Sequence, residues 1–345
     1  MYTSFLRLGR AFAPTRDALI HFAILAGLLS LASIARAQIN ISHLSTYATG
    51  SYNTAAAEIV TYDAVNDRIF FVNAQLNQVV ALDASNPAAP TLAFTLPMAA
   101  YGASANSVAV VPGGIAVAVE ANTKTDPGTA VFFNASGVFL SQLTVGALPD
   151  MITVTPDGTK VLVANEGEPN TAYTIDPFGT VSVIDITGGL ATLTAANVTT
   201  IDFSAYTPAM IPGVRIFGPG ASVAQDMEPE YITVSDDSQK AFVVFQENNA
   251  VARINLATNT IEQVVSLGLK DHSLAGNGLD ASDNPTGINI ATWPVKGVYM
   301  PDAIDSYTVG GQTYVVYANE GDAREWGTFV EPRRIGNAAY LLDPT

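Results

Sequence analysis

The sequence predicts an all-β fold, specifically a β-propeller built from four-stranded blades. Apolar and polar residues alternate through most of the chain after residue 38, a pattern typical of half-buried strands. These strand-rich stretches recur in units of about 40–45 residues, which is the usual length of a propeller blade. No convincing amphipathic helix interrupts them. We expect about five or six blades, which would form an incomplete seven-bladed propeller.

The clearest unit spans Leu148–Gly189. Its first two apolar runs flank Thr155-Pro156-Asp157-Gly158, whose residue types favour a tight turn. An acidic corner at Asn165–Pro169 follows, and a third apolar run ends in Gly188-Gly189. This order of runs and turns predicts an antiparallel sheet.

The same pattern returns in other parts of the chain. The interval from Glu58 to Asn73 equals that from Asp150 to Asn165, at 15 residues, so two separate units share one register. A β-sandwich, the main alternative, would explain alternating strands but not this repeated interval. The further units are Glu58–Asp83, Ser107–Val145, Glu228–Leu267 and Met300–Asp322.

Two stretches lengthen the repeat and are predicted to be insertions in the propeller domain. The first, near 193–226, is rich in proline and glycine, and we expect it to run over the surface. The second lies near 270–298.

The N-terminus has the features of a secretory signal peptide, residues 1–37, followed by the propeller domain at 38–345. Arginines precede an apolar run at 18–35, and Ala35-Arg36-Ala37 fits a cleavage site. An uncleaved membrane anchor is the alternative, because a run of this length can just span a bilayer. We expect a secreted, periplasmic or cell-surface protein.

Composition narrows the range of partners. Acidic residues outnumber basic ones by 31 to 15, giving a formal net charge of -16. Such a surface repels nucleic acid and anionic lipid, so we expect neither a nucleic acid nor a membrane partner after signal cleavage. The chain has no cysteine, which excludes disulfides and thiolate chemistry. We expect a monomer.

Several short phrases of the sequence resemble the choice-of-anchor I family. They are Ala164–Pro169, Glu228–Tyr231 with Gln246–Asn249, Gly276–Asp283, Trp293–Gly297 and Ala318–Arg324. The resemblance extends from about Ala56 to the C-terminus and implies a bacterial secreted or surface β-propeller, with no established reaction. The chain stops at Thr345 without the sorting signal of such proteins, so we expect a C-terminally truncated member.

Acidic and amide residues recur at the corner after the second strand of a unit. In a propeller these corners repeat at one end of the blades, so Asn165-Glu166, Gln246-Glu247 and Asn319-Glu320 should form part of one ring. The residues predicted to bind a ligand there are Asn165, Glu166, Glu168, Gln246, Glu247, Asn319, Glu320, Asp322 and Arg324.

The same ring predicts a metal site. Carboxylates brought together repel one another, and a hard cation bound through oxygen would relieve this repulsion. Calcium is the expected ion outside the cell, although these residues would equally serve as turns that cap strand ends. The predicted ligands are Asp150, Glu166, Glu230, Asp302 and Glu320, with Asp280 and Asp283 in a separate polar loop that lacks the EF-hand spacing.

Catalytic sets of familiar type are absent from the sequence. It contains neither a Gly-x-Ser-x-Gly elbow nor a His-Glu-x-x-His pair. Arg324, Arg333 and Arg334 would either bind an anion such as phosphate or form solvated ion pairs.

These features favour a non-enzymatic extracellular module that binds a protein, a glycan or another surface ligand. The alternative is a calcium-dependent phosphoesterase resembling phytase-type propellers, in which acidic loops hold cations that bridge to a phosphorylated substrate.

Signal cleavage gives the first testable prediction. Mass spectrometry of secreted protein should find Gln38 at the N-terminus, because cleavage is expected after Ala37. Recovery of the chain from membranes with residues 18–35 still attached would contradict secretion.

Overall fold

The computed structural model describes residues 41–282, 287–327 and 329–334. The chain divides into two units, residues 1–44 and 45–345, and the second contains all the strands described below. The predicted signal peptide and its cleavage site lie outside the described residues. Among the residues that are described, no helix is long and apolar enough to cross a membrane.

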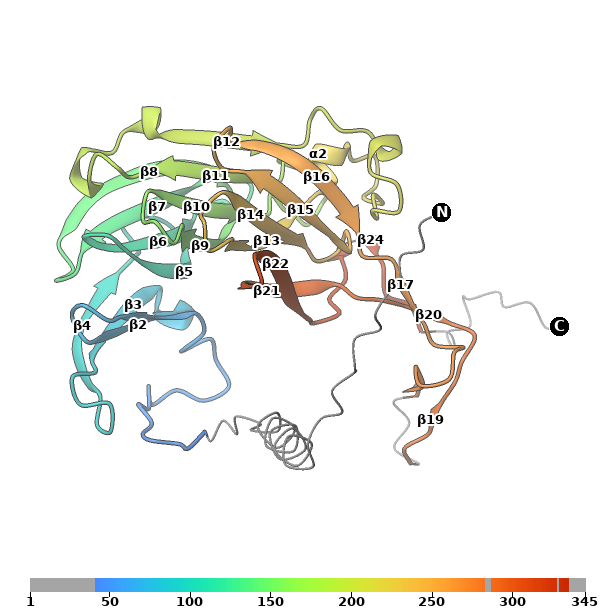
Figure 1. Cartoon of the computed structure of the whole chain (residues 1–345), viewed down its shortest axis with the longest axis horizontal. Coiled ribbons are helices and arrows are strands. Elements are labelled where there is room, and N and C mark those ends of the chain that lie inside the picture. Colours follow the sequence, from blue (N-terminus) through green and yellow to red (C-terminus); the bar gives the residue numbers. More distant parts are fainter. Residues whose placement is uncertain (1–40, 283–286, 328, 335–345) are drawn as a thin grey trace, which may run out of the picture. The chain divides into compact units, whose positions relative to one another are not determined.

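The second unit is a β-propeller of four-stranded antiparallel blades, which confirms the predicted fold class (Figure 1). Four blades are complete within the described ranges, each with its strands in simple sequential order. The first blade has β1 (Val60–Asp63), β2 (Arg68–Asn73), β3 (Gln78–Asp83) and β4 (Thr91–Pro97); the second has β5 (Ser104–Val111), β6 (Gly114–Glu120), β7 (Pro127–Asn134) and β8 (Phe139–Ala147); the third has β9 (Pro149–Val154), β10 (Lys160–Asn165), β11 (Thr180–Asp185) and β12 (Val198–Asp202); the fourth has β13 (Pro229–Val234), β14 (Lys240–Phe245), β15 (Ala250–Asn255) and β16 (Thr260–Ser266).

A fifth sheet has two strands in the described part of the chain, β21 (Pro301–Val309) and β22 (Gln312–Asn319). In the described part of the 270–298 stretch before it, the chain forms two short strand pairs. The shorter strands are β17 (Leu269–Asp271) paired with β20 (Lys296–Val298), β18 (Leu279–Asp280) with β19 (Ile290–Ala291), and later β23 (Glu325–Trp326) with β24 (Phe329–Val330).

Neighbouring blades bury one another's faces. In β6, Ile115 and Val117 pack toward the first blade, while the intervening Ala116 packs toward the third. In β10, Val163 likewise faces the second blade and Leu162 faces the fourth. Because adjacent strand residues point to opposite faces, each apolar run contributes to two cores at once.

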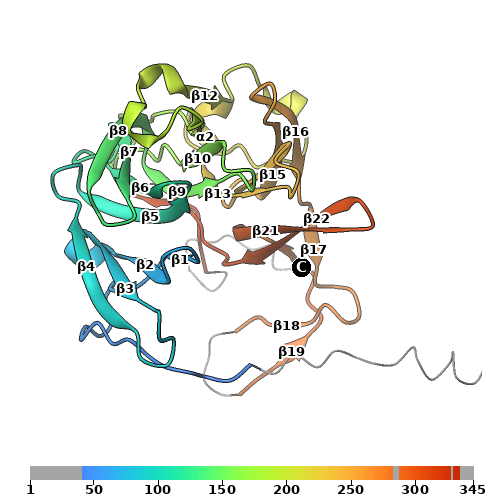
Figure 2. The same ribbon diagram turned by 60° about the vertical axis from the view of Figure 1, so that its left-hand side comes forward.

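The first strand of each sheet lies beside the first strand of the next, so that β1, β5, β9, β13 and β21 follow one another (Figure 2). These strands begin at corresponding positions of the repeat. Residues at the start of each first strand are thereby brought close to one another.

The predicted turn at Thr155–Gly158 is present and recurs in the fourth blade. The Thr155 hydroxyl donates to Asp157 Oδ1 at 2.6 Å, and the Ser235 hydroxyl donates to Asp237 Oδ1 at 2.7 Å. Gly158 has a φ of 69°, and Ser238 takes the same left-handed conformation with a φ of 59°. The same turn, with its side-chain hydrogen bond, therefore forms in the fourth blade without a glycine.

Each complete blade also ends its third strand in the same way, a repeat that was not predicted from the sequence. An Asp or Asn side chain accepts a hydrogen bond at 2.9 Å from the backbone N–H two residues later, which closes a tight turn. The four acceptors are Asp83, Asn134, Asp185 and Asn255.

The expectation of a surface excursion at 193–226 is wrong in part. Val198–Asp202 is β12, the outermost strand of the third blade, and Phe203 and Ile211 are buried in the core between the third and fourth blades. The stretch ends in the short helix α2 (Val223–Asp226), whose Asp226 is fully buried. Its prolines and glycines concealed the short strand, because they suggested a loop.

Candidate functional site

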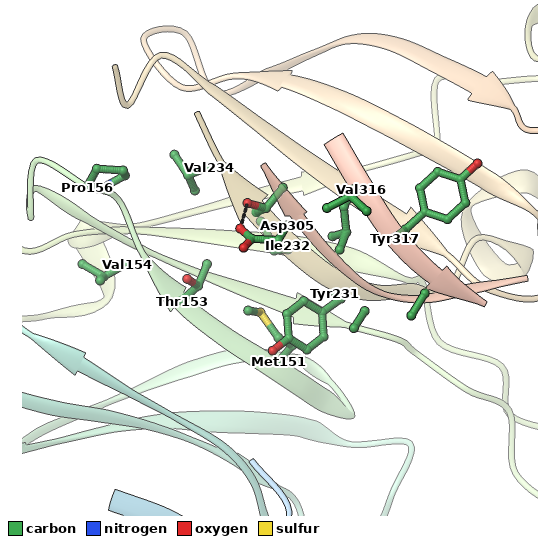
Figure 3. Close-up of a pocket in the computed structure, with 14 residues that line it drawn as sticks. Met151, Thr153, Val154, Pro156, Tyr231, Ile232, Val234, Asp305, Val316 and Tyr317 are labelled. Atoms are coloured by element: carbon green, nitrogen blue, oxygen red, sulfur yellow. Dashed lines mark hydrogen bonds between the residues drawn. The ribbon is translucent and has the colours of Figure 1, made fainter. Parts of the chain in front are cut away.

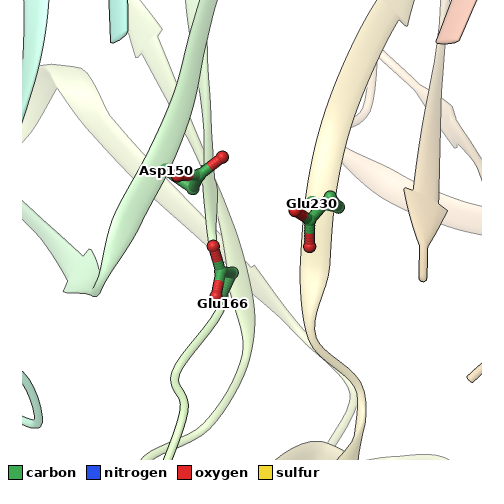
Figure 4. A group of neighbouring side chains, drawn as sticks. All are labelled: Asp150, Glu166 and Glu230. Atoms are coloured by element: carbon green, nitrogen blue, oxygen red, sulfur yellow. The ribbon is translucent and has the colours of Figure 1, made fainter. Parts of the chain in front are cut away.

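Three carboxylates meet where the third and fourth blades begin (Figure 4). Asp150 is the second residue of β9, Glu230 is the second residue of β13, and Glu166 directly follows β10. One oxygen from each lies within 4.8 Å of the others. We call these three residues the acidic cluster.

Local backbone structure sets this arrangement. Leu148, two residues before Asp150, has a φ of 48°, and its carbonyl accepts a hydrogen bond from the Glu166 backbone N–H at 2.9 Å. The fifth sheet has the same backbone arrangement at Met300. Its φ is 52°, and its carbonyl accepts a hydrogen bond from the Glu320 backbone N–H at 3.2 Å. A positive φ is strained for residues with bulky side chains, so this conformation is held by its surroundings.

Burial and mutual repulsion disfavour the charged forms of the cluster. Burial, followed by the charges of Asp302, Glu58 and Glu120, raises the pKa of Asp150 to about 7, while the charge of Lys124 opposes this rise. Burial also raises the pKa values of Glu166 and Glu230 well above their usual range, with Asp150 as the next cause for both. The cluster therefore favours any bound cation or proton that relieves this repulsion.

Two of the other predicted metal ligands lie at the edge of this region. Burial raises the pKa of Asp302, followed by the charge of Glu320. Glu320 itself is exposed, and its Oε2 accepts a hydrogen bond from Gln246 Nε2 at 3.0 Å.

The predicted ring is offset by one residue in the fourth blade. Strand pairing aligns Phe245 with Asn165, because each lies opposite the proline that begins the first strand of its blade. Gln246 is therefore the counterpart of Glu166 and Glu320, and Glu247 lies one position further along. The sequence phrases suggested a different alignment, since Asn-Glu and Gln-Glu look alike.

The remaining binding residues have different roles. Asn165 is fully buried, and its amide donates to the Thr180 carbonyl at 3.2 Å and to the Ser182 hydroxyl at 3.1 Å, so it joins strands within the sheet. Glu168 forms an ion pair with Lys124. Asn319 and Asp322 are exposed.

The second predicted calcium loop does not join the cluster. Asp280 lies in the β18–β19 pair, where its carboxylate accepts hydrogen bonds from the backbone of Ser282 at 3.3 Å and of Asn289 at 3.1 Å. Asp283 lies outside the described residues.

Arg324 is buried, which corrects the expectation of a solvated or anion-binding arginine. Its guanidinium pairs with Asp226 and lies 2.9 Å from Glu228 Oε2, and it also donates to the Asp226 carbonyl at 2.6 Å. The side chains of Arg324 and Asp226 are 1% and 0% exposed. No sequence pattern indicates this group, because residue 324 is far from 226 and 228 along the chain.

The segment that follows Arg324 continues along earlier blades. Lys124 Nζ lies 5.1 Å from the centre of the Trp326 ring, and Phe329 packs edge-on against Tyr173. Glu331 pairs with Arg215. This 324–331 segment therefore contacts loops that precede it by more than one blade.

A cleft of about 640 Å³ lies between the third blade, the fourth blade and the fifth sheet (Figure 3). Its walls come from β9, β13, β21 and β22, and include Met151, Tyr231 and Tyr317. Met151 and Tyr231 directly follow Asp150 and Glu230, so the cleft lies along the two strands that carry these carboxylates. Its lining combines apolar, aromatic and hydroxyl groups, as in many ligand sites.

Comparisons with known proteins give one family and several distant structural likenesses. The model of the choice-of-anchor I domain matches residues 58–345. None of the curated proteins matches the chain.

Among solved structures, Kuenenia stuttgartiensis hydrazine synthase is similar, with 17% identity and a TM-score of 0.45 over 68% of this chain and 55% of that one. The β-propeller domain of a Myceliophteria thermophila protein shows 12% identity and a TM-score of 0.40 over 63% of this chain and 56% of that one. A nidogen/laminin complex shows 12% identity and a TM-score of 0.43 over 76% of this chain and 71% of that one. The chain thus spans just over half the length of the first two, and likenesses this distant bear on no function.

Arg324 should be essential for stability. Changing Arg324→Gln leaves Asp226 and Glu228 buried without a counter-charge, which should lower the free energy of unfolding by about 3–5 kcal/mol. The control is Arg253→Gln, because Arg253 pairs with Glu262 at 2.8 Å with its side chain 45% exposed and should contribute less than about 1 kcal/mol. Denaturant unfolding measures both, and equal small losses would contradict a structural role for the buried pair.

Asp150 should make the protein less stable as pH rises. Its pKa is about 7 in the folded state against 3.8 ordinarily, so between these values the folded state keeps a proton that the unfolded state loses. The free energy of unfolding therefore falls from about pH 4 to about pH 7 and the loss persists above that. With a metal chelator present, Asp150→Asn should match the parent near pH 4 and exceed it at pH 8 by at least about 1.4 kcal/mol, the equivalent of one pKa unit.

The control for this measurement is Asp236→Asn, in the exposed turn between β13 and β14. It removes the same charge away from the cluster and should change stability equally at both pH values. An unchanged pH dependence in Asp150→Asn would contradict a raised pKa of Asp150 in the folded protein.

Proposed function

The chain belongs to the choice-of-anchor I domain family, and we propose that it is a secreted or cell-surface β-propeller that binds a partner through the blade ends carrying the acidic cluster. The signal-peptide pattern of the sequence supports this location. We further propose that a divalent cation, calcium outside the cell, occupies the cluster as part of the binding site.

The meeting of Asp150, Glu166 and Glu230 carries this proposal. Oxygens within 4.8 Å of one another can bind the same ion, since calcium–oxygen bonds measure about 2.3–2.6 Å. A bound ion would offset the repulsion that raises the pKa values of these groups. Calcium suits the site because it accepts several carboxylate oxygens in flexible geometry.

The cleft along β9 and β13 suggests where a partner would bind. A loop or chain-end of an extracellular protein, or a glycan, could contact Tyr231 and Tyr317 while an oxygen of the same partner completes the coordination of the ion. The net charge of -16 favours such partners over nucleic acid or an anionic membrane. We propose that the protein acts as a monomer.

A calcium-dependent phosphoesterase is the alternative function of the same cluster. It would need free basic groups to neutralise a phosphate. The basic groups that act on this region are already engaged, because Lys124 pairs with Glu168, Arg215 with Glu331, and Arg324 with Asp226. The binding function is therefore better supported.

Calcium should stabilise the folded protein specifically. At a calcium concentration about a hundredfold above the dissociation constant, binding adds roughly 2.7 kcal/mol, or a rise of about 4 °C in melting temperature for a domain of this size. Magnesium at equal ionic strength should have less effect, because it demands stricter geometry. The shift caused by calcium should be lost in Glu166→Gln and kept in Asp236→Asn.

Melting curves with calcium, with magnesium and with a chelator test this prediction. Identical curves in the three conditions would remove the metal site and leave the acidic corners as strand-end turns. An assay of phosphomonoester hydrolysis on the same samples separates the two functions. Calcium-dependent turnover that disappears in Glu166→Gln would favour the enzyme.

A further inference from the structure

A β-bulge interrupts the first strand of the third blade, of the fourth blade and of the fifth sheet, and each bulge carries a carboxylate. In the third blade the strand pairing passes from Met151 to Pro149, so Asp150 is the extra residue of the ladder. Glu230 and Asp302 lie at the corresponding interruptions of β13 and β21. A bulge changes the direction in which a side chain points, so the positions of these carboxylates depend on the local backbone.

The second blade has an amide at the same position. In β5 the strand pairing passes from Ala105 to Ser107, which makes Asn106 the counterpart of Asp150. An ionised carboxylate only accepts hydrogen bonds, whereas an amide also donates them. Asn106 Nδ2 donates to the Pro149 carbonyl of the third blade at 3.2 Å.

This hydrogen bond acts directly beside a member of the acidic cluster. The Pro149 carbonyl belongs to the planar peptide group that links Pro149 to Asp150, so its orientation fixes where the Asp150 backbone lies. On the other side of Asp150, the Ile152 N–H donates to Ser107 Oγ at 3.2 Å. Two side chains of β5 therefore hold β9 on either side of Asp150.

Asparagine side chains hold the other two bulged strands as well. In the fourth blade, Asn248 Oδ1 accepts a hydrogen bond from the Glu228 N–H at 3.2 Å, two residues before the bulge carboxylate. In the fifth sheet, Asn249 Oδ1 accepts from the Met300 N–H at 3.3 Å, again two residues before the carboxylate. Asn248 and Asn249 are 0% and 1% exposed, whereas Asn106 is half-buried and can be replaced with less effect on the core.

We propose that Asn106 is a positioning residue for the acidic cluster. Its amide holds the Pro149–Asp150 peptide and thereby keeps the Asp150 carboxylate where it can share a cation with the other two members. This inference rests on the proposed function, because the three carboxylates are the proposed ligands of the ion. Hydrogen bonds that orient metal ligands in this way change metal affinity by about 10–100-fold.

Repulsion within the cluster makes this hydrogen bond important. The three carboxylates have oxygens within 4.8 Å of one another, and without an ion their like charges favour separation. A bond that fixes the backbone at Asp150 opposes this separation, so less rearrangement is needed when an ion binds. Loss of the bond should therefore weaken cation binding more than it weakens the fold.

Calcium titration by isothermal calorimetry near pH 8 tests the proposal. In Asn106→Ala the dissociation constant for calcium should rise by about tenfold or more, because the bond that orients Asp150 is lost. Asn106→Thr should have the same effect, since threonine suits a strand but its hydroxyl reaches less far than the amide. This second variant keeps the test decisive if Asn106→Ala fails to fold.

Europium(III), bound in place of calcium, gives a readout that does not depend on stability. Its luminescence lifetimes in ordinary and in heavy water report how many waters the ion carries. A carboxylate that leaves the ion is replaced by water. Both Asn106 variants should therefore carry more water on the ion than the parent does.

The matched control is Asn197→Ala. Asn197 Nδ2 donates to the Asp185 carbonyl at 3.2 Å, a hydrogen bond of the same type and length, beside the outermost strand β12. Its loss should lower the stability to urea and leave the calcium affinity and the water count at their parental values.

Three outcomes would contradict the proposal. Parental affinity and water count in both Asn106 variants would overturn the positioning role and leave the proposed function intact. An equal loss of affinity in Asn197→Ala would also overturn it, since the effect would then follow stability alone. An absence of calcium binding in the parent would overturn the cation site and the positioning role together.

Discussion

The second and third blades of this protein are apolar on both faces, and each is buried between two other blades. This constraint explains the sequence, in which the second strand of a blade is almost continuously apolar. Val161 and Val163 pack against the second blade, and Leu162 and Ala164 pack against the fourth. A blade isolated from its neighbours would expose one of these sets, so its stability depends on stacking.

Stacking the blades also gathers charge. When β9, β13 and β21 lie side by side, the second residue of each strand is brought near its equivalents. Asp150, Glu230 and Asp302 occupy this position, and all three have raised pKa values. The packing that stabilises the fold thus concentrates carboxylates in one place, which is unfavourable unless an ion or a proton compensates. The stacking of the blades therefore produces both the apolar core and the candidate site.

Local patterns in the sequence predicted most of the strands and the meeting of Asp150, Glu166 and Glu230. Strands and turns can be predicted because the alternation of apolar residues and the residue types of a turn are local features of the sequence. The meeting of the carboxylates can be predicted because the number of residues between the start of a first strand and the corner after the second strand is the same in separate blades. The strand Val198–Asp202 was missed because it is short and lies among prolines and glycines. The buried pair of Arg324 and Asp226 was missed for another reason: no periodic pattern links residues so far apart. The one-residue offset at Gln246 needed the observed strand pairing, since similar phrases conceal a difference in register.

The 324–331 segment has a consequence for the order in which the chain can fold. Asp226 and Glu228 are made nearly a hundred residues before the arginine that neutralises them. Until Arg324 emerges, the fourth blade can close only by burying uncompensated carboxylates, which is unfavourable. Contacts so distant in sequence form slowly, because a long loop must close first. Stable closure of the fourth blade is therefore expected only once Arg324 is available to pair with Asp226 and Glu228.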